Sequence, residues 1–170
     1  MRSRIVRTIC FATLSFGLAA VAPAQESRLH CTMAGRAGVY GLTWSGTMFL
    51  PTGATPAVAV GRITFDDAGN VSGSQTVSKG GAVGQFTMTG TYTMNEDCTG
   101  TVSVSVYDQA GNLSSKATWA TVSVDDMTEA HGIITSMVAA NGTNVPVAIA
   151  SSLKKLFTRN WWNELPGLVW

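Results

Sequence analysis

The chain has 170 residues, of which 45% are hydrophobic and only 12% are charged. Its 11 basic and 10 acidic residues nearly balance. The sequence therefore lacks the basic surface of a nucleic-acid-binding protein, and we expect no nucleic-acid partner. The length is sufficient for one domain with a substantial core.

Residues 1–24 have the layout of a secretory signal peptide. Three arginines precede an apolar stretch at residues 9–21, and the small residues Ala22 and Ala24 follow it. A membrane-spanning helix needs about 20 apolar residues, so we expect cleavage and a mature protein without a transmembrane span. The predicted location is secreted or periplasmic. The alternative is an uncleaved membrane anchor.

Residues 25–152 are predicted to form a β-barrel domain. Apolar and hydroxyl residues alternate with a period of two along most of this segment, which is typical of strands with one buried face. The predicted strands are 39–50, 57–65, 71–79, 82–94, 100–107, 114–125, 129–140 and 144–152.

One motif occurs twice, at residues 65–72 and 107–114. Both copies read aromatic-Asp-x-Ala-Gly-Asn-aliphatic-Ser. Glycine and asparagine tolerate positive φ, so each copy predicts a hairpin turn. No helix-length periodic segment separates the strands, which favours an antiparallel meander. The predicted fold is all-β, a single eight-stranded antiparallel barrel, with a two-sheet β-sandwich as the alternative.

Two irregularities refine the predicted strands. Gly46 and Gly90 interrupt the apolar parity of their strands, as expected where a bent strand needs room. Apolar residues change parity between Trp119 and Val122, which predicts a bulge near residues 120–121.

Cys31 and Cys98 are the only cysteines after the signal peptide. Two cysteines in an exported protein most simply form one disulfide. The chain-entropy contribution of a loop of 67 residues is roughly 4 kcal/mol. The chain has only two histidines and no C-x-x-C motif, so we predict neither a metal site nor a cofactor.

Residues 153–170 are predicted to form an amphipathic aromatic tail. Their apolar residues have helical spacing: Leu153, Leu156, Phe157, Trp161, Leu165 and Leu168. A short helix packed on the barrel is the first interpretation. An interfacial membrane helix and a poorly ordered tail are the alternatives. An exposed aromatic tail would also favour a homo-oligomer.

Three segments resemble a known group of proteins. Residues 40–47, 60–74 and 89–101 resemble small exported bacterial proteins of unknown function that are similar to the allene oxide cyclase barrel, a calycin-like fold shared with plant dirigent proteins. The resemblance covers residues 31–150 and also implies that Cys31 pairs with Cys98. Cyclases that have this barrel hold a reactive intermediate in a folded conformation inside an apolar cavity. None of their catalytic motifs is matched here residue by residue, and none is carried over.

The candidate ligand-binding residues lie on apolar strand faces. Nearly all acidic residues fall in turns, and no catalytic triad or calcium loop is assembled, so no catalytic residue is assigned. His131 shares its parity with Ile133 and Met137, which would turn it inward. The candidates are Trp44, Phe86, Tyr92, Trp119 and His131. Plain core filling by the aromatic side chains is the alternative.

These observations favour a non-catalytic barrel that binds a small apolar ligand. One alternative is an enzyme, a cyclase or isomerase with His131 or Gln85 as its polar group, and this interpretation rests on fold analogy. Another is a structural or protein-interaction module of the cell surface that works through its Thr/Ser-rich exterior or its tail.

Overall fold

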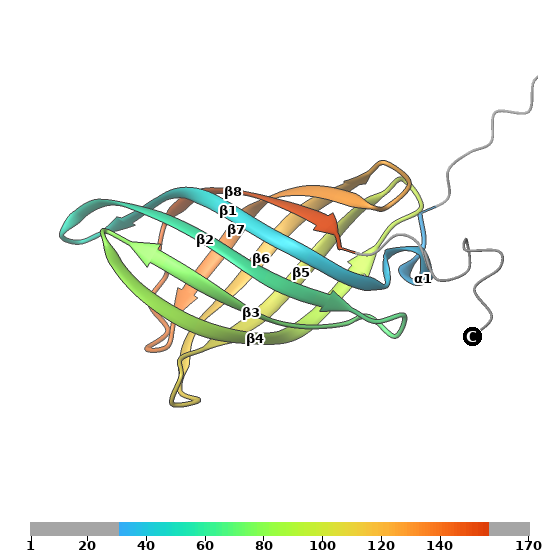
Figure 1. The fold of residues 1–170 in the computed structure, drawn as a ribbon. Coiled ribbons are helices and arrows are strands. Elements are labelled where there is room, and N and C mark those ends of the chain that lie inside the picture. Colours follow the sequence, from blue (N-terminus) through green and yellow to red (C-terminus); the bar gives the residue numbers. More distant parts are fainter. Residues whose placement is uncertain (1–30, 157–170) are drawn as a thin grey trace, which may run out of the picture.

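The computed structural model describes residues 31–156 (Figure 1). The predicted signal peptide at residues 1–24 and the tail beyond residue 156 lie outside the described residues. No helix within residues 31–156 has the length and apolar character to cross a membrane.

A short helix and eight strands make up the described chain. They are α1 (Met33–Arg36), β1 (Gly38–Leu50), β2 (Gly53–Phe65), β3 (Asn70–Lys79), β4 (Ala82–Met94), β5 (Thr99–Tyr107), β6 (Leu113–Val124), β7 (Glu129–Ala139) and β8 (Val147–Lys155). Each strand pairs antiparallel with the next, and β8 pairs with β1 to close the barrel. The predicted barrel is confirmed, and the sandwich is wrong. Helix α1 lies at one end of the barrel, and the β1–β2 and β3–β4 hairpins lie at the other (Figure 1).

The last strand runs further than predicted. Strand β8 covers Val147–Lys155 in place of residues 144–152. Ile149, Ser151 and Leu153 are all buried and follow the period of a strand. Leu153 pairs with Leu42 across the β1–β8 seam. The helical spacing that predicted a tail from residue 153 is therefore overridden by strand pairing up to residue 155.

Both copies of the repeated motif form the same turn. The carboxylate of Asp66 accepts the backbone N–H of Asn70 at 2.7 Å and its side-chain amide at 2.8 Å. Asp108 accepts the corresponding groups of Asn112 at 2.8 and 3.2 Å. Gly69 and Gly111 have φ values of 89° and 82°, which explains the glycine in each copy. The motif thus encodes the β2–β3 and β5–β6 turns.

The predicted bulge at residues 120–121 is wrong. Strand β6 keeps one parity inward throughout, and Val122 faces outward with 41% of its surface exposed. One register shift lies at the start of β6, where Val106 pairs with Ser115 and Tyr107 with Leu113, and another lies in β7. Thr118 pairs with Ser136 and Trp119 with Ile134, which leaves one extra residue, Thr135, on β7. Its hydroxyl donates to the Thr118 carbonyl at 3.2 Å.

The bulge changes which residues of β7 face the interior. Ala130 and Ile134 are buried before it, and Met137 packs against the core after it, at the opposite parity. Because a bulge inserts one residue, the inward set shifts by one position. His131 and Ile133 therefore do not share a face with Met137.

Glycines occupy inward positions where neighbouring strands approach closely. A Cβ atom at Gly46 would overlap the carbonyl oxygen of Ala148, and one at Gly90 would overlap that of Ser103. We expected these two glycines where a bent strand needs room. The structure shows that the backbone of the adjacent strand occupies the place of each missing side chain.

We expect Gly46→Ala to lower the free energy of unfolding by about 1–3 kcal/mol, because an overpacked interior forces the backbone to shift. Urea denaturation measures the effect. Ser45→Ala is the matched control, since Ser45 is exposed on the outer face of the same strand, and its effect should stay within about 0.5 kcal/mol. Equal losses in the two variants would contradict the steric explanation.

The two motif turns should make the barrel sensitive to acid. Hydrogen bonds from the side-chain amide and backbone of Asn70 lower the pKa of Asp66, and those from the backbone and side chain of Asn112 lower the pKa of Asp108. Because each pKa is lower in the folded protein, the turns stabilise it above the unfolded pKa of about 3.9. This contribution is lost as the pH falls through the folded pKa.

In the variant Asp66→Asn/Asp108→Asn we therefore expect a smaller fall in Tm between about pH 6 and about pH 3 than in the wild type. Thermal unfolding followed by circular dichroism measures it. Asp67→Asn controls for the lost charge, because the Asp67 side chain accepts no hydrogen bond from residues 31–156. A double variant with an unchanged acid response would show that the turns do not cause it.

Candidate functional site

The barrel is closed at the end that carries α1 by a plug, which consists of α1 with the buried Arg36 and the rings of Tyr40, Phe65 and Tyr92. Arg36, the last residue of this helix, is 1% exposed. Its guanidinium carbon lies 4.6 Å from the ring centroid of Tyr40 and 4.6 Å from that of Phe65. Its Nη1 donates to the Ser123 hydroxyl at 3.3 Å, and its Nη2 has no hydrogen-bond partner among the described residues. Burial lowers the pKa of Arg36, and the two π faces offset part of the lost hydration.

Three aromatic rings complete this plug. Phe65 packs edge-to-face against Tyr40 at 5.5 Å and against Tyr92 at 4.9 Å between centroids. The Tyr40 hydroxyl lies 2.8 Å from the carbonyl oxygens of both Met127 and Arg36. The Tyr92 hydroxyl lies 3.0 Å from the carbonyl oxygen of Met33 and 2.5 Å from that of Asp66, and each hydroxyl donates to one of its two acceptors at a time. Burial raises the pKa of both tyrosines. Tyr92, a predicted ligand-binding residue, thus holds the helix in place.

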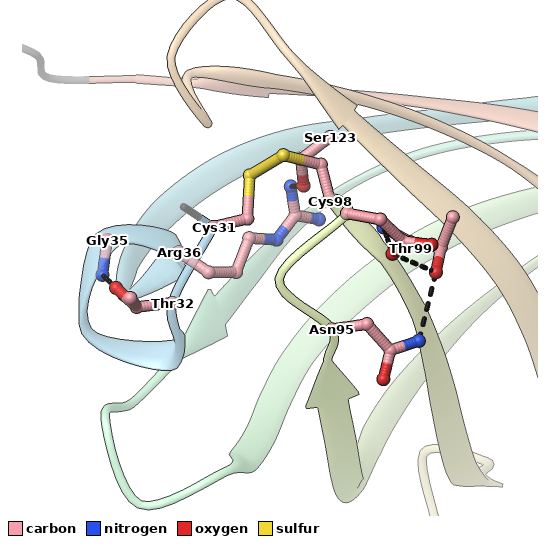
Figure 2. Close-up of a disulfide and its surroundings, with 9 residues drawn as sticks. Cys31, Thr32, Gly35, Arg36, Asn95, Cys98, Thr99 and Ser123 are labelled. Atoms are coloured by element: carbon pink, nitrogen blue, oxygen red, sulfur yellow. Dashed lines mark hydrogen bonds between the residues drawn. A yellow bond between two sulfur atoms is a disulfide. The ribbon is translucent and has the colours of Figure 1, made fainter. Parts of the chain in front are cut away.

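A disulfide ties the plug to the barrel wall. Cys31 and Cys98 are bonded, as predicted, and their Cα atoms are 4.9 Å apart. Figure 2 shows the disulfide beside Arg36 and Ser123. The carbonyl of Cys98 accepts the Ser123 N–H at 2.9 Å, so the covalent link, the buried cation and β6 meet at one point. The plug cannot leave the barrel without disturbing all three.

A pocket occupies the opposite end of the barrel. Its volume is about 380 Å³, which lies in the range of small-molecule sites. The predicted residues Trp44, Phe86 and Trp119 line it. Met48 and Met137 also form part of its wall, and methionine side chains adapt readily to ligand shape.

The pocket ends at a packed middle layer. Trp119 also borders a void of only about 20 Å³, whose other walls include Leu42, Met88 and Leu153. These three side chains are at most 5% exposed. The interior therefore has a packed end and an open end.

Few polar groups reach the pocket. Gln75, which is 8% exposed, accepts a hydrogen bond from the indole Nε1 of Trp44 at 2.8 Å. The buried Ser115 also lines the pocket. Lys79, at the end of β3, is the one ionisable residue among the lining residues that the structure describes. Such a surface suits the binding of an apolar molecule better than proton transfer.

Two residues considered from the sequence lie outside the barrel. The His131 side chain is 54% exposed, and its Nε2 lies 3.5 Å from a carboxylate oxygen of Glu129. The bulge at Thr135 explains the error: it separates His131 from Met137, so the two residues no longer lie on the same face of β7. Gln85 is also exposed, and its side-chain oxygen accepts a hydrogen bond from Gln109 at 3.1 Å. Neither side chain reaches the pocket.

Gln75 and Ser115 were missed by the sequence reasoning. Gln75 shares its inward parity with Val71 and Val77, so a polar residue on an apolar face was the available signal. Its partner Trp44 lies on β1, two strands away, and this contact depends on barrel closure. Ser115 lacked even this signal because serines are frequent in the chain.

A second hollow lies on the outer face of the barrel. It has a volume of about 540 Å³ and is bordered by Arg62, Gln85 and the Asp108–Gln109 part of the β5–β6 turn. Although larger, it is open to solvent and lined mainly by polar residues. We regard the interior pocket as the candidate site because it can remove a ligand from water. Residues 31–156 contain no group of three or more His, Cys, Asp or Glu side chains that could hold a metal ion.

The sequence matches no model of a known protein family and no curated protein. The site is therefore interpreted from its geometry alone.

We expect Cys31→Ser/Cys98→Ser to lower the free energy of unfolding by roughly 4 kcal/mol, because the crosslink restricts an unfolded loop of 67 residues. Urea denaturation measures the loss. Wild-type protein reduced with dithiothreitol should show the same loss, and a variant as stable as the oxidised wild type would contradict the stabilising role.

Proposed function

We propose that this protein is an exported, non-catalytic barrel that binds a small apolar ligand in the pocket at the β1–β2 and β3–β4 end. The observation that carries the proposal is the apolar cavity of about 380 Å³ in a barrel whose other end is densely packed. An eight-stranded barrel can either fill its interior or hold one small ligand. In this barrel, side chains fill the end that carries α1, and the opposite end has room for a ligand.

The disulfide supports the exported location. Disulfides persist in oxidising compartments such as the periplasm and the extracellular space, and Cys31 and Cys98 form a disulfide in this structure. Together with the predicted signal peptide, this supports a secreted or periplasmic protein. Membership of the allene oxide cyclase-like barrel group is likewise a proposal, supported by the closed meander of eight strands.

The cyclase or isomerase alternative has less support. His131 and Gln85 were its two polar candidates, and both lie on the outer surface. A catalytic interpretation would have to use the pocket's own polar residues. Gln75 and Ser115 do not titrate near neutral pH, and Lys79 is exposed at the end of β3. The pocket therefore favours binding over acid–base chemistry.

Native mass spectrometry of the mature protein from its own host tests the proposal. We expect an additional mass of a few hundred daltons that dissociates on denaturation, in keeping with a pocket of this volume. Ala117→Trp should remove it, because Ala117 is 4% exposed and lines the pocket, so a large side chain would occupy the ligand's volume. Ala139→Trp, near the mouth, provides a second variant in case the first is misfolded.

His131→Ala is the matched control on the outer face and should retain the bound mass. The ligand affinity of the pocket-filling variants should fall by about tenfold or more, which corresponds to 1.4 kcal/mol of lost interaction. A bare wild-type protein that also fails to bind neutral apolar probes would contradict the proposed function.

A further inference from the structure

The Gln75–Trp44 pair places a polar group within the apolar wall of the pocket. The two residues lie on β3 and β1, with β2 between them. The inward positions of β2 at this level are the small residues Ala59 and Gly61, which pair with Trp44 and Gln75, respectively. Their size leaves room for a hydrogen bond of 2.8 Å to cross above β2.

This hydrogen bond determines how the Gln75 amide is oriented. An indole N–H can only donate, so the group facing it must be the Gln75 carbonyl oxygen. The other end of the amide, Nε2, then carries two N–H donors. No hydrogen bond from Nε2 to any residue between 31 and 156 is present. Nε2 is not one of the fully buried unpaired atoms, so water can reach it in the free protein. A bound molecule that covered Nε2 without offering an acceptor would leave this donor buried and unpaired, at a cost of about 1–3 kcal/mol. An oxygen on the bound molecule would avoid that cost.

The charge distribution indicates that this oxygen is neutral. Lys79 is four residues further along β3 and shares the inward parity of Gln75, so their Cα atoms lie about 13 Å apart along the strand. A carboxylate at Gln75 would therefore be buried without a cation, which is strongly unfavourable. The oxygen of a ketone, ester or ether carries no such cost.

We propose that the pocket takes an apolar molecule bearing a neutral acceptor oxygen, and that Gln75 Nε2 donates a hydrogen bond to this oxygen. The inference rests on the proposed function and names the ligand class. Gln75 is then the specificity-determining residue, and Trp44 positions its amide. An aliphatic chain without oxygen would fill the same volume but leave the amide donors unpaired.

A matched pair of probes tests the inference in the mature protein freed of ligand. The probes are 2-decanone and decane, which have the same chain length and differ in one carbonyl group. Their dissociation constants are measured by competition with the neutral fluorophore N-phenyl-1-naphthylamine. We compare the ketone-to-alkane affinity ratio between variants, because the hydration of each probe then cancels.

We expect Gln75→Met to reduce that ratio by about tenfold, the effect of one hydrogen bond of about 1.4 kcal/mol. The double variant Trp44→Phe/Gln75→Met should reduce the ratio equally. This variant also removes the indole N–H that Gln75→Met alone would leave unpaired. Ser72→Ala is the control on the same strand and should leave the ratio unchanged, because Ser72 is exposed on the outer face of β3 and does not line the pocket. In wild-type protein, 2-decanone should shift the Trp44 indole N–H resonance further than decane does, because neighbouring hydrogen bonds polarise one another.

The outcomes separate the two proposals. Binding of both probes with the same ratio in wild type and Gln75→Met would overturn this inference and leave the proposed function intact. Failure of both probes to bind would overturn the proposed function as well. Preference for decanoate over 2-decanone, abolished in Lys79→Met, would overturn the neutral acceptor in favour of an anionic group bound at the rim.

Discussion

The contact of the Arg36 guanidinium with the rings of Tyr40 and Phe65 determines which end of this barrel is closed. An eight-stranded barrel has an interior that side chains can just fill. At the α1 end, one arginine and three aromatic rings fill it. A lysine, Lys155, adds a second cation 5.6 Å from the Tyr40 ring. At the other end of the barrel, no residue between 31 and 156 fills the interior in this way, and the pocket lies there.

Arg36 is buried without a carboxylate partner among residues 31–156, and the surrounding contacts show how the free-energy cost of burying its charge is offset. Desolvation opposes the charge, while two π faces, the Ser123 hydroxyl and dense packing favour it. Nη2 remains unpaired among the described residues. The disulfide holds α1 at the end of the barrel where Arg36 is buried. Less chain entropy is therefore lost when Arg36 inserts than in a segment without this crosslink.

Much of the fold was predictable because the period of two along the strands is a local signal. The strands of the barrel and the inward positions of Trp44, Phe86 and Trp119 followed from it. The two turns followed from the repeated Gly-Asn motif, and the disulfide followed from the presence of two cysteines in a chain predicted to be exported. His131 was placed wrongly because one extra residue, Thr135, reverses the parity of β7, and no local pattern marks that residue. Tyr92 has the inward parity that was predicted. It lies near the end of β4 and contacts α1 through Met33, so it belongs to the packed end of the barrel and does not line the pocket.

The size of the inward side chains explains why room remains at the pocket end. The lining of the pocket includes the small residues Ala82, Gly84, Ala117 and Ala139. At the plugged end the large side chains meet one another. Stability and binding thus rest on different residues of one barrel. Because the packed layer of Leu42, Met88 and Leu153 lies between them, changes in pocket residues can alter which molecule fits without loosening the disulfide-linked plug.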